Sequence, residues 1–179
     1  MAINLQKMVQ SYGQVVDIKK YEYVFRQGDT DSNIYLLEFG LLKAYYLSSK
    51  GKETIKSFIS SGSLIASLTA VYRKEFCSFN LIALHDSRLF QLPFAHLSQA
   101  AEDSHSVALE LVEVLLQLSM KKENREYELL ALPAHERYRK LCEISPELLD
   151  IVTQNDIAHY LGITPVALSR IKKRLKFTV

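Results

Sequence analysis

The sequence predicts an α+β fold in which a strand-rich N-terminal part is followed by a long helix and a small helical part. Three observations lead to this expectation. Short segments rich in Val, Ile, Phe and Tyr recur between about residues 15 and 93. A stretch of about thirty residues without Gly or Pro follows, and the end of the chain holds a glycine turn between two short helical patterns. We place the boundaries at 1–97, 98–131 and 132–179.

The composition excludes several classes of protein. With 179 residues, 48% hydrophobic and 23% charged, the chain is typical of a globular protein. No apolar run approaches the roughly 18 residues of a membrane span, and the first ten residues lack the apolar core of a signal peptide. We therefore expect a cytoplasmic protein with no membrane partner. Cys77 and Cys142 lie far apart without a histidine cluster, so we expect neither a disulfide framework nor a metal site.

Seven segments of the N-terminal part are expected to be strands. Several alternate polar and apolar residues, and turn signals such as QGDTDSN at 27–33 separate them. The segments are 15–18, 21–25, 33–38, 41–48, 54–59, 79–84 and 87–92. Strands spaced about ten residues apart predict a compact antiparallel sandwich or barrel.

The central stretch from 98 to 130 is expected to be one helix. Its apolar residues Val107, Leu111, Val114 and Leu118 recur at spacings of four, three and four, which is typical of a coiled-coil seam. Thirty residues would form a rod of roughly 45 Å, more than one small barrel can cover. We expect this seam to join two copies of the chain, and the alternative is an amphipathic helix that lies on its own barrel.

The end of the chain has the spacing of two helices joined by a tight turn. Pro133 closes the rod, a short helix is expected at 135–144, and 146–152 can add a turn. Thr153 followed three residues later by Asp156 resembles a capping box.

Gly162 then supplies a positive φ, and Thr164-Pro165 starts a second helix. The shared core these two helices require is supplied by Ile157, Ala158, Leu161, Ile163, Leu168 and Ile171. This is a helix-turn-helix arrangement, and a helical hairpin without a DNA role is the alternative.

Charge is concentrated beside this motif. Residues 151–179 hold five basic groups and one acid, whereas residues 101–150 carry a net charge of −5. A basic tip on a near-neutral protein indicates a polyanionic partner, although a solvated helix end is also compatible with it. The residues expected to read base edges are Thr164, Val166, Ala167, Ser169 and Arg170, and Arg170 can pair with guanine. Those expected to contact phosphates are Lys172, Lys173, Arg174 and Lys176.

Together, residues 23–68 and 153–175 resemble the Crp/Fnr family of bacterial transcription regulators. The resemblance implies a jelly-roll-like β-roll that binds an effector and a dimerisation helix at 98–131. It also implies a homodimer that binds an inverted repeat in double-stranded DNA, with RNA polymerase as a partner of an activator. The sequence ends eight residues after Ile171, where family members often continue into a two-stranded wing, so we expect either that the wing is absent or that the sequence is truncated.

The resemblance also indicates where an effector would bind. Cyclic-nucleotide binders of the family use a Gly-Glu pair and an Arg-Ser pair, and these positions fall on residues 66–67 and 77–78 as Ala-Ser and Cys-Ser. Without the arginine, the cyclic phosphate lacks its partner, so we expect cyclic AMP not to bind. We expect no iron-sulfur or haem cofactor either, and the effector stays unknown. The candidate effector pocket consists of Ser67, Arg73, Cys77 and Ser78.

These observations favour a homodimeric, sequence-specific DNA-binding regulator. No nucleophile-base pair, metal-ligand spacing or phosphate loop is present in the sequence, so we do not expect an enzyme. The alternative function is a sensor of a small ligand or cyclic nucleotide that acts by protein contact, with the C-terminal motif as an interaction surface.

Overall fold

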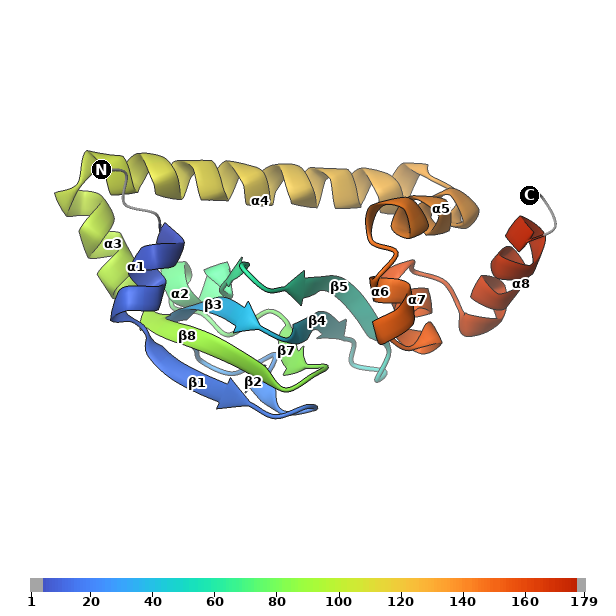
Figure 1. Cartoon of the computed structure of the whole chain (residues 1–179), viewed down its shortest axis with the longest axis horizontal. Coiled ribbons are helices and arrows are strands. Elements are labelled where there is room, and N and C mark those ends of the chain that lie inside the picture. Colours follow the sequence, from blue (N-terminus) through green and yellow to red (C-terminus); the bar gives the residue numbers. More distant parts are fainter. Residues whose placement is uncertain (1–4, 177–179) are drawn as a thin grey trace. The chain divides into compact units, whose positions relative to one another are not determined.

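The computed structural model describes residues 5–176, and Figure 1 shows its elements in chain order. The side chain of Lys176, one of the predicted phosphate contacts, lies outside the described residues. The expectation about the wing concerns residues after 176 and lies outside them as well. The chain divides into two compact units, and the long helix α4 (His105–Ala131) passes from the first into the second between Gln117 and Leu118.

The first unit is a roll of two four-stranded sheets whose assigned strand pairs are antiparallel. One sheet has the order β1 (Gln14–Ile18), β8 (Ser87–Pro93), β3 (Asn33–Phe39) and β6 (Leu64–Ile65). The other has the order β2 (Tyr23–Phe25), β7 (Asn80–Ala83), β4 (Leu41–Leu47) and β5 (Glu53–Ser60). All seven predicted strands are present, and the predicted roll is confirmed. The two-residue β6 is too short to show an alternating pattern.

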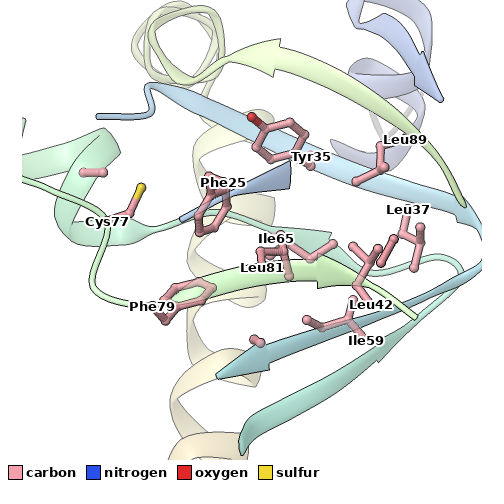
Figure 2. Packing of buried hydrophobic residues seen from close by; sticks show 13 residues of the cluster. Phe25, Tyr35, Leu37, Leu42, Ile59, Ile65, Cys77, Phe79, Leu81 and Leu89 are labelled. Carbon is pink, nitrogen blue, oxygen red and sulfur yellow. The ribbon is translucent and has the colours of Figure 1, made fainter. Parts of the chain in front are cut away.

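The interior of the roll is filled by aliphatic and aromatic side chains. In β4 and β7 the inward-facing residues pair across the strands, Leu42 with Ala83 and Ala44 with Leu81. Figure 2 shows side chains from both sheets pointing toward one another. The buried cluster consists of Phe25, Tyr35, Leu37, Leu42, Ala44, Ile59, Ile65, Ala70, Cys77, Phe79, Leu81, Ala83 and Leu89. The period of two in these strands therefore directs one face of each sheet into a common core.

Four helices accompany the roll. They are α1 (Leu5–Tyr12), α2 (Leu68–Arg73), α3 (Phe94–Asp103) and the first part of α4. The sequence analysis does not predict α1 or α2, which are short. A second apolar cluster joins α1, α3 and α4 to the sheet of β3 and β8. It consists of Leu5, Val9, Ile34, Leu36, Phe90, Leu92, Leu97 and Val107.

The single helix expected from residue 98 to residue 130 is wrong, because the chain breaks at Ser104. This residue is extended, with φ −139° and ψ 113°, and it separates α3 from α4. Its N–H donates to the carbonyl of Ala100 at 3.0 Å, while its own carbonyl accepts from the N–H of Ala108 at 3.0 Å. The prediction of one continuous helix relied on the absence of Gly and Pro from this stretch. Ser104 shows that a serine can end one helix and precede the next without either residue.

The second unit combines the last part of α4 with four shorter helices. These are α5 (Ala134–Ile144), α6 (Leu148–Ile151), α7 (Gln154–Tyr160) and α8 (Pro165–Lys176). The helix predicted at 135–144 and the helical turn within 146–152 are confirmed. On the helices of this unit, the buried apolar side chains are Tyr138, Leu141, Val152, Ile157, Ala158, Leu161 and Leu168.

Candidate nucleic-acid interface and effector site

Helix α7 begins at a reciprocal cap. The side-chain oxygen of Thr153 accepts from the N–H of Asp156 at 3.1 Å. The same hydroxyl donates to the Asp156 carboxylate at 2.8 Å. An orphan N–H of the first turn is satisfied, and a carboxylate stands at the positive end of the helix. The predicted cap at Thr153 is confirmed.

The turn between α7 and α8 requires glycine. Gly162 has φ +68°, a conformation that residues with a Cβ rarely adopt. Helix α8 begins at Pro165, and the side-chain oxygen of Thr164 accepts from the N–H of Ala167 at 3.2 Å. Both local signals read from the sequence are therefore present, and they determine where the second helix begins.

A small shared core holds α8 against α7. Ile157, Leu161 and Leu168 are each 1% exposed, and Ala158 is fully buried. The other two predicted core residues, Ile163 and Ile171, are partly buried. Because α7 and α8 pack through these side chains, the outer face of α8 has a defined orientation on the motif.

One face of α8 carries most of the predicted base-reading residues. Val166, Ser169, Arg170 and Lys173 are all exposed, and their spacing of i, i+3, i+4 and i+7 places them on one side of the helix. Thr164 is exposed just before the helix. Ala167 is partly buried, and its N–H is used by the cap.

The predicted phosphate-binding residues differ in their surroundings. The Lys172 ammonium donates to the Gln154 side-chain oxygen at 2.8 Å and is partly buried, so the first residue of α7 orients it. Lys173 and Arg174 are exposed. A shallow groove of about 240 Å³ lies between α7 and α8, and its lining includes Pro165 and Ser169.

Two arginines that the sequence analysis does not single out contact the end of α7. Arg137 of α5 donates to the carbonyl of Leu161 at 2.9 Å and to that of Leu132 at 2.6 Å. Arg125 of α4 donates to the carbonyl of Tyr160, and its guanidinium carbon lies 3.8 Å from the centre of the Tyr160 ring. Burial lowers the pKa of Arg125 and raises that of Tyr160. The sequence marks Arg125 and Arg137 only as positive charges within the acidic stretch of residues 101–150, which does not indicate their contacts with α7.

Three of the four predicted effector residues lie together in the roll. Ser67 is 1% exposed, and its side-chain oxygen accepts from the N–H of Ser78 at 3.4 Å. Cys77 is 2% exposed, and burial raises the pKa of its thiol. Arg73 lies at the exposed end of α2 and makes no hydrogen bond or ion pair with these residues. Among the described contacts, none brings the Arg73 guanidinium to Ser67, Cys77 or Ser78, so Arg73 does not replace the missing arginine here.

Aromatic rings occupy the interior of the roll beside Cys77. The rings of Phe25 and Phe79 meet edge to face with centroids 5.1 Å apart, and Figure 2 shows Tyr35 near them. The Lys56 ammonium lies 3.7 Å from the centre of the Phe79 ring. A ligand placed between the sheets would have to displace these side chains.

A larger groove lies elsewhere on the roll. It has a volume of about 700 Å³ and runs between α2, α3 and the turn at 30–32. Its lining includes Tyr72, Phe94 and the carboxylates of Asp31 and Glu102. The predicted effector residues do not line it, so the groove and the predicted pocket are different places.

Three of the four predicted seam residues pack inside the roll unit. Val107 is 1% exposed and belongs to the cluster under α1 and α3, and Leu111 and Val114 pack against that cluster. Val107 is therefore occupied within the roll unit, which contradicts its assignment to a partner and fits the alternative of a helix packed on its own roll. The assignment of the partly buried Leu111 and Val114 to a partner stays a prediction. The fourth predicted residue, Leu118, is partly buried.

A different face of α4 is apolar and exposed. Leu109, Val112, Leu116 and Met120 are between 46% and 57% exposed. At about 100° per residue, Leu109 points about 200° away from Val107, toward the opposite side of the helix. Spacing alone identifies an apolar stripe on α4, but it does not distinguish the buried stripe from the exposed one.

The described residues offer neither a metal cluster nor a membrane-spanning helix. Within residues 5–176, no group of three or more His, Cys, Asp or Glu side chains could hold a metal ion. Across the same range, every helix is too short or too polar to cross a lipid bilayer.

The chain matches one protein family and is similar to several known regulatory proteins. Residues 15–104 match the cyclic nucleotide-binding domain family. The anaerobic regulatory protein of Haemophilus influenzae is 27% identical over 170 residues, which cover 89% of this chain and 65% of that protein. The transcriptional activator protein Anr of Pseudomonas protegens is 25% identical, with coverage of 89% and 69%. The chain thus spans slightly less than two thirds of the length of the first of these relatives and slightly more than two thirds of the second.

Solved structures share the fold. FixK2 from Bradyrhizobium japonicum has a TM-score of 0.80 at 21% identity, covering 93% of this chain and 85% of that one. CprK in complex with OCPA has a TM-score of 0.73 at 17% identity, covering 99% and 84%. At such identities the likeness concerns the fold.

Proposed function

Because the chain belongs to the cyclic nucleotide-binding domain family and to the Crp/Fnr regulators, we propose that it binds an inverted repeat in double-stranded DNA as a homodimer. Regulators of this family bind DNA, act as dimers and contact RNA polymerase, and they are not enzymes. The proposal includes the residues that read DNA, the dimer face and the response to effectors.

The exposed face of α8 carries the proposal. A helix-turn-helix presents the N-terminal part of its second helix to base edges in the major groove. Here that face offers a guanidinium from Arg170, a hydroxyl from Ser169 and an apolar surface from Val166, while Lys173 adds charge on the same side. Arginine can form two hydrogen bonds to guanine, and an apolar side chain can contact the methyl group of thymine. This set of groups fits sequence reading better than it fits an interface with another protein.

Charge supplies the affinity that is independent of sequence. Lys173 and Arg174 are exposed beside the reading face, and Lys172 is oriented by Gln154. Each phosphate that such a cation neutralises releases counterions, so binding should weaken as salt is raised. The RNA polymerase contact belongs to this proposal if the protein activates transcription.

The exposed stripe of α4 is the dimer face that we propose. This stripe is a row of large, solvent-exposed apolar side chains, formed by Leu109, Val112, Leu116 and Met120. Pairing two such stripes about a dyad would bury these side chains. Two recognition helices related by that dyad would meet half-sites roughly 34 Å apart.

The roll supports a response to something other than a cyclic nucleotide. Cys77 and Ser78 stand where the family's nucleotide binders have Arg-Ser, and Ala66 and Ser67 stand where they have Gly-Glu. Ser67 uses its oxygen within the protein, and Phe79 is buried in the same apolar cluster as Cys77. We therefore propose that any small-molecule effector of this chain lacks a cyclic phosphate.

Selection from a library of random duplexes tests the proposed function. The full chain should enrich an inverted repeat, and its affinity for the selected duplex should fall as salt increases. The control duplex keeps both half-sites in direct orientation, and we expect weaker binding to it. If the selected and starting pools bind equally, the DNA-binding proposal is wrong and the sensor that acts by protein contact becomes the better explanation.

A further inference from the structure

Arg137 joins the ends of two helices. The last carbonyl groups of an α-helix have no partner within the helix. Near the end of α4, Arg137 Nη1 lies within 3.4 Å of the carbonyl oxygens of Glu128 and Leu129 and 2.6 Å from that of Leu132. Its Nη2 donates to the carbonyl of Leu161, the C-terminal cap of α7, at 2.9 Å. One guanidinium therefore satisfies acceptors from both α4 and the first helix of the helix-turn-helix.

Arg125 makes a second connection between the same two helices. It lies in the C-terminal part of α4 and donates to the carbonyl of Tyr160. Its guanidinium stacks on the Tyr160 ring, and one of its nitrogens lies 4.0 Å from the carboxylate of Glu128. Because Tyr160 and Leu161 are consecutive, the two arginines bind neighbouring carbonyl groups at the C-terminal end of α7.

The chemistry of these contacts depends on arginine. A guanidinium presents five donors in a planar fork and stacks on aromatic rings, whereas an ammonium is a compact charge that does neither. A cation at a helix C-terminus is also favoured by the helix dipole, and here two helix ends are served. Lysine at these positions would keep the charge and lose the bridging geometry.

We propose that Arg125 and Arg137 act as a clamp that fixes the helix-turn-helix to the C-terminal part of α4, so that a reorientation of that part of α4 is passed to α8. Both are positioning residues, since neither belongs to the exposed face of α8. The consequence for DNA binding rests on the proposed function, whereas the clamp itself does not.

Distance measurements between two spin labels test the clamp without DNA. The labelled chain carries Lys121→Cys on α4 and Asn155→Cys on α7, which are exposed positions, together with Cys142→Ser. One spin label is attached to each of the two introduced cysteines. Buried Cys77 stays unlabelled, and excess unlabelled chain prevents distances between two labelled copies. We expect one narrow distance distribution in the parent chain. The double variant R125K/R137K should broaden it about twofold or more, because several orientations become populated.

Arg139→Lys is the matched control, since Arg139 is an exposed residue of the same helix α5. It should leave the distribution unchanged. An unchanged width in R125K/R137K would overturn the proposal. If the double variant does not fold, R125K alone decides, because it leaves all contacts of Arg137 in place. Its distribution should also broaden, and a width equal to that of the parent would reject the clamp.

Binding to DNA separates the clamp from a merely structural role. Affinity of R125K/R137K for the full inverted repeat should fall about tenfold, because the two recognition helices are no longer held in place before binding. Affinity for a single half-site should stay within about twofold, since α8 itself is unchanged. Equal losses on both duplexes would mean that the arginines only support the folding of the motif, which refutes the clamp. If the parent chain binds no duplex, the proposed function fails while the label distances still decide the clamp.

Discussion

Arg170 is exposed on α8, beside Ser169 and one turn before Lys173, and its guanidinium can donate to two acceptors of a guanine. Replacing Arg170 with alanine removes both donors while leaving the buried side of the helix intact. We expect a loss of about 1 to 3 kcal/mol of discrimination at one base pair in each half-site. The measurement is the affinity of parent and variant for duplexes that carry each of the four base pairs at that position.

Lys173→Ala is the control for this prediction. A phosphate contact carries no information about sequence, so this variant should weaken binding to all duplexes by a similar factor and reduce the salt dependence. If Arg170→Ala instead behaves like Lys173→Ala, the guanidinium contacts phosphate and the assignment of base reading to Arg170 is wrong.

At this same scale the sequence reveals some roles and hides others. The roles of Gly162 and Thr164 follow from the sequence alone, because a positive φ and an N-cap are properties of one residue and its immediate neighbours. The role of Arg137 does not, because its acceptor Leu161 is 24 residues away and only the packed helices bring the two together. The same holds for Arg125, whose contact with Tyr160 spans 35 residues.

At the scale of the element, the start of α7 is held by the bonds between Thr153 and Asp156. Thr153→Ala removes the acceptor of the Asp156 N–H and leaves the carboxylate, which is only 9% exposed, without its hydroxyl partner. We expect this variant to lower the free energy of unfolding by about 1 kcal/mol. Chemical denaturation followed by helical circular dichroism measures the change.

Thr153→Ser keeps the hydroxyl and is the matched variant. It should retain most of the stability, since serine is as good an N-cap as threonine. If the alanine and serine variants unfold at the same denaturant concentration as the parent, the cap contributes nothing to the stability of the second unit.

Helix α4 shows the limit of periodicity as a guide to partners. The spacing of Val107, Leu111 and Val114 predicts an apolar seam, and the stripe exists. The same spacing is produced by a helix that packs on its own domain and by one that pairs with a second copy. Only the positions of α1, α3 and the roll show that this stripe is occupied within the chain, and that Leu109 and Leu116 face outward.

At the scale of the whole molecule, the roll keeps the family fold while its interior is occupied by its own side chains. Phe25, Tyr35 and Phe79 form part of one buried cluster. Cys77, which the sequence resemblance predicts at the position of the family's arginine, belongs to the same cluster. We expect that titration calorimetry with cyclic AMP shows no binding stronger than about 1 mM, which corresponds to about −4 kcal/mol. The variant Cys77→Arg is titrated in parallel. If it binds cyclic AMP more tightly than the parent chain, the missing positive charge is what prevents binding. A micromolar constant for the parent chain would contradict the prediction.

The exposed stripe of α4 makes a prediction about the assembly. Leu109→Glu and Leu116→Glu together place two carboxylates in the proposed dimer face, where pairing would bring like charges together and bury them. We expect this variant to sediment as a monomer at concentrations where the parent is a dimer. Gln117→Glu with Asn124→Glu adds the same charge at exposed positions of α4 outside the stripe and should leave the dimer intact.

The variant also decides which apolar face of α4 joins two copies. Leu111 packs against the cluster inside the roll unit, so Leu111→Glu should lower the stability of that unit before it changes the mass in solution. Leu109 and Leu116 are exposed in the single chain, so their replacement should change the mass and leave thermal unfolding of the roll nearly unchanged. If L109E/L116E remains a dimer, the interface lies on other elements, and the half-site spacing expected from paired α4 helices loses its basis. Sedimentation and melting of the same two proteins therefore separate a partner-facing stripe from a roll-facing one.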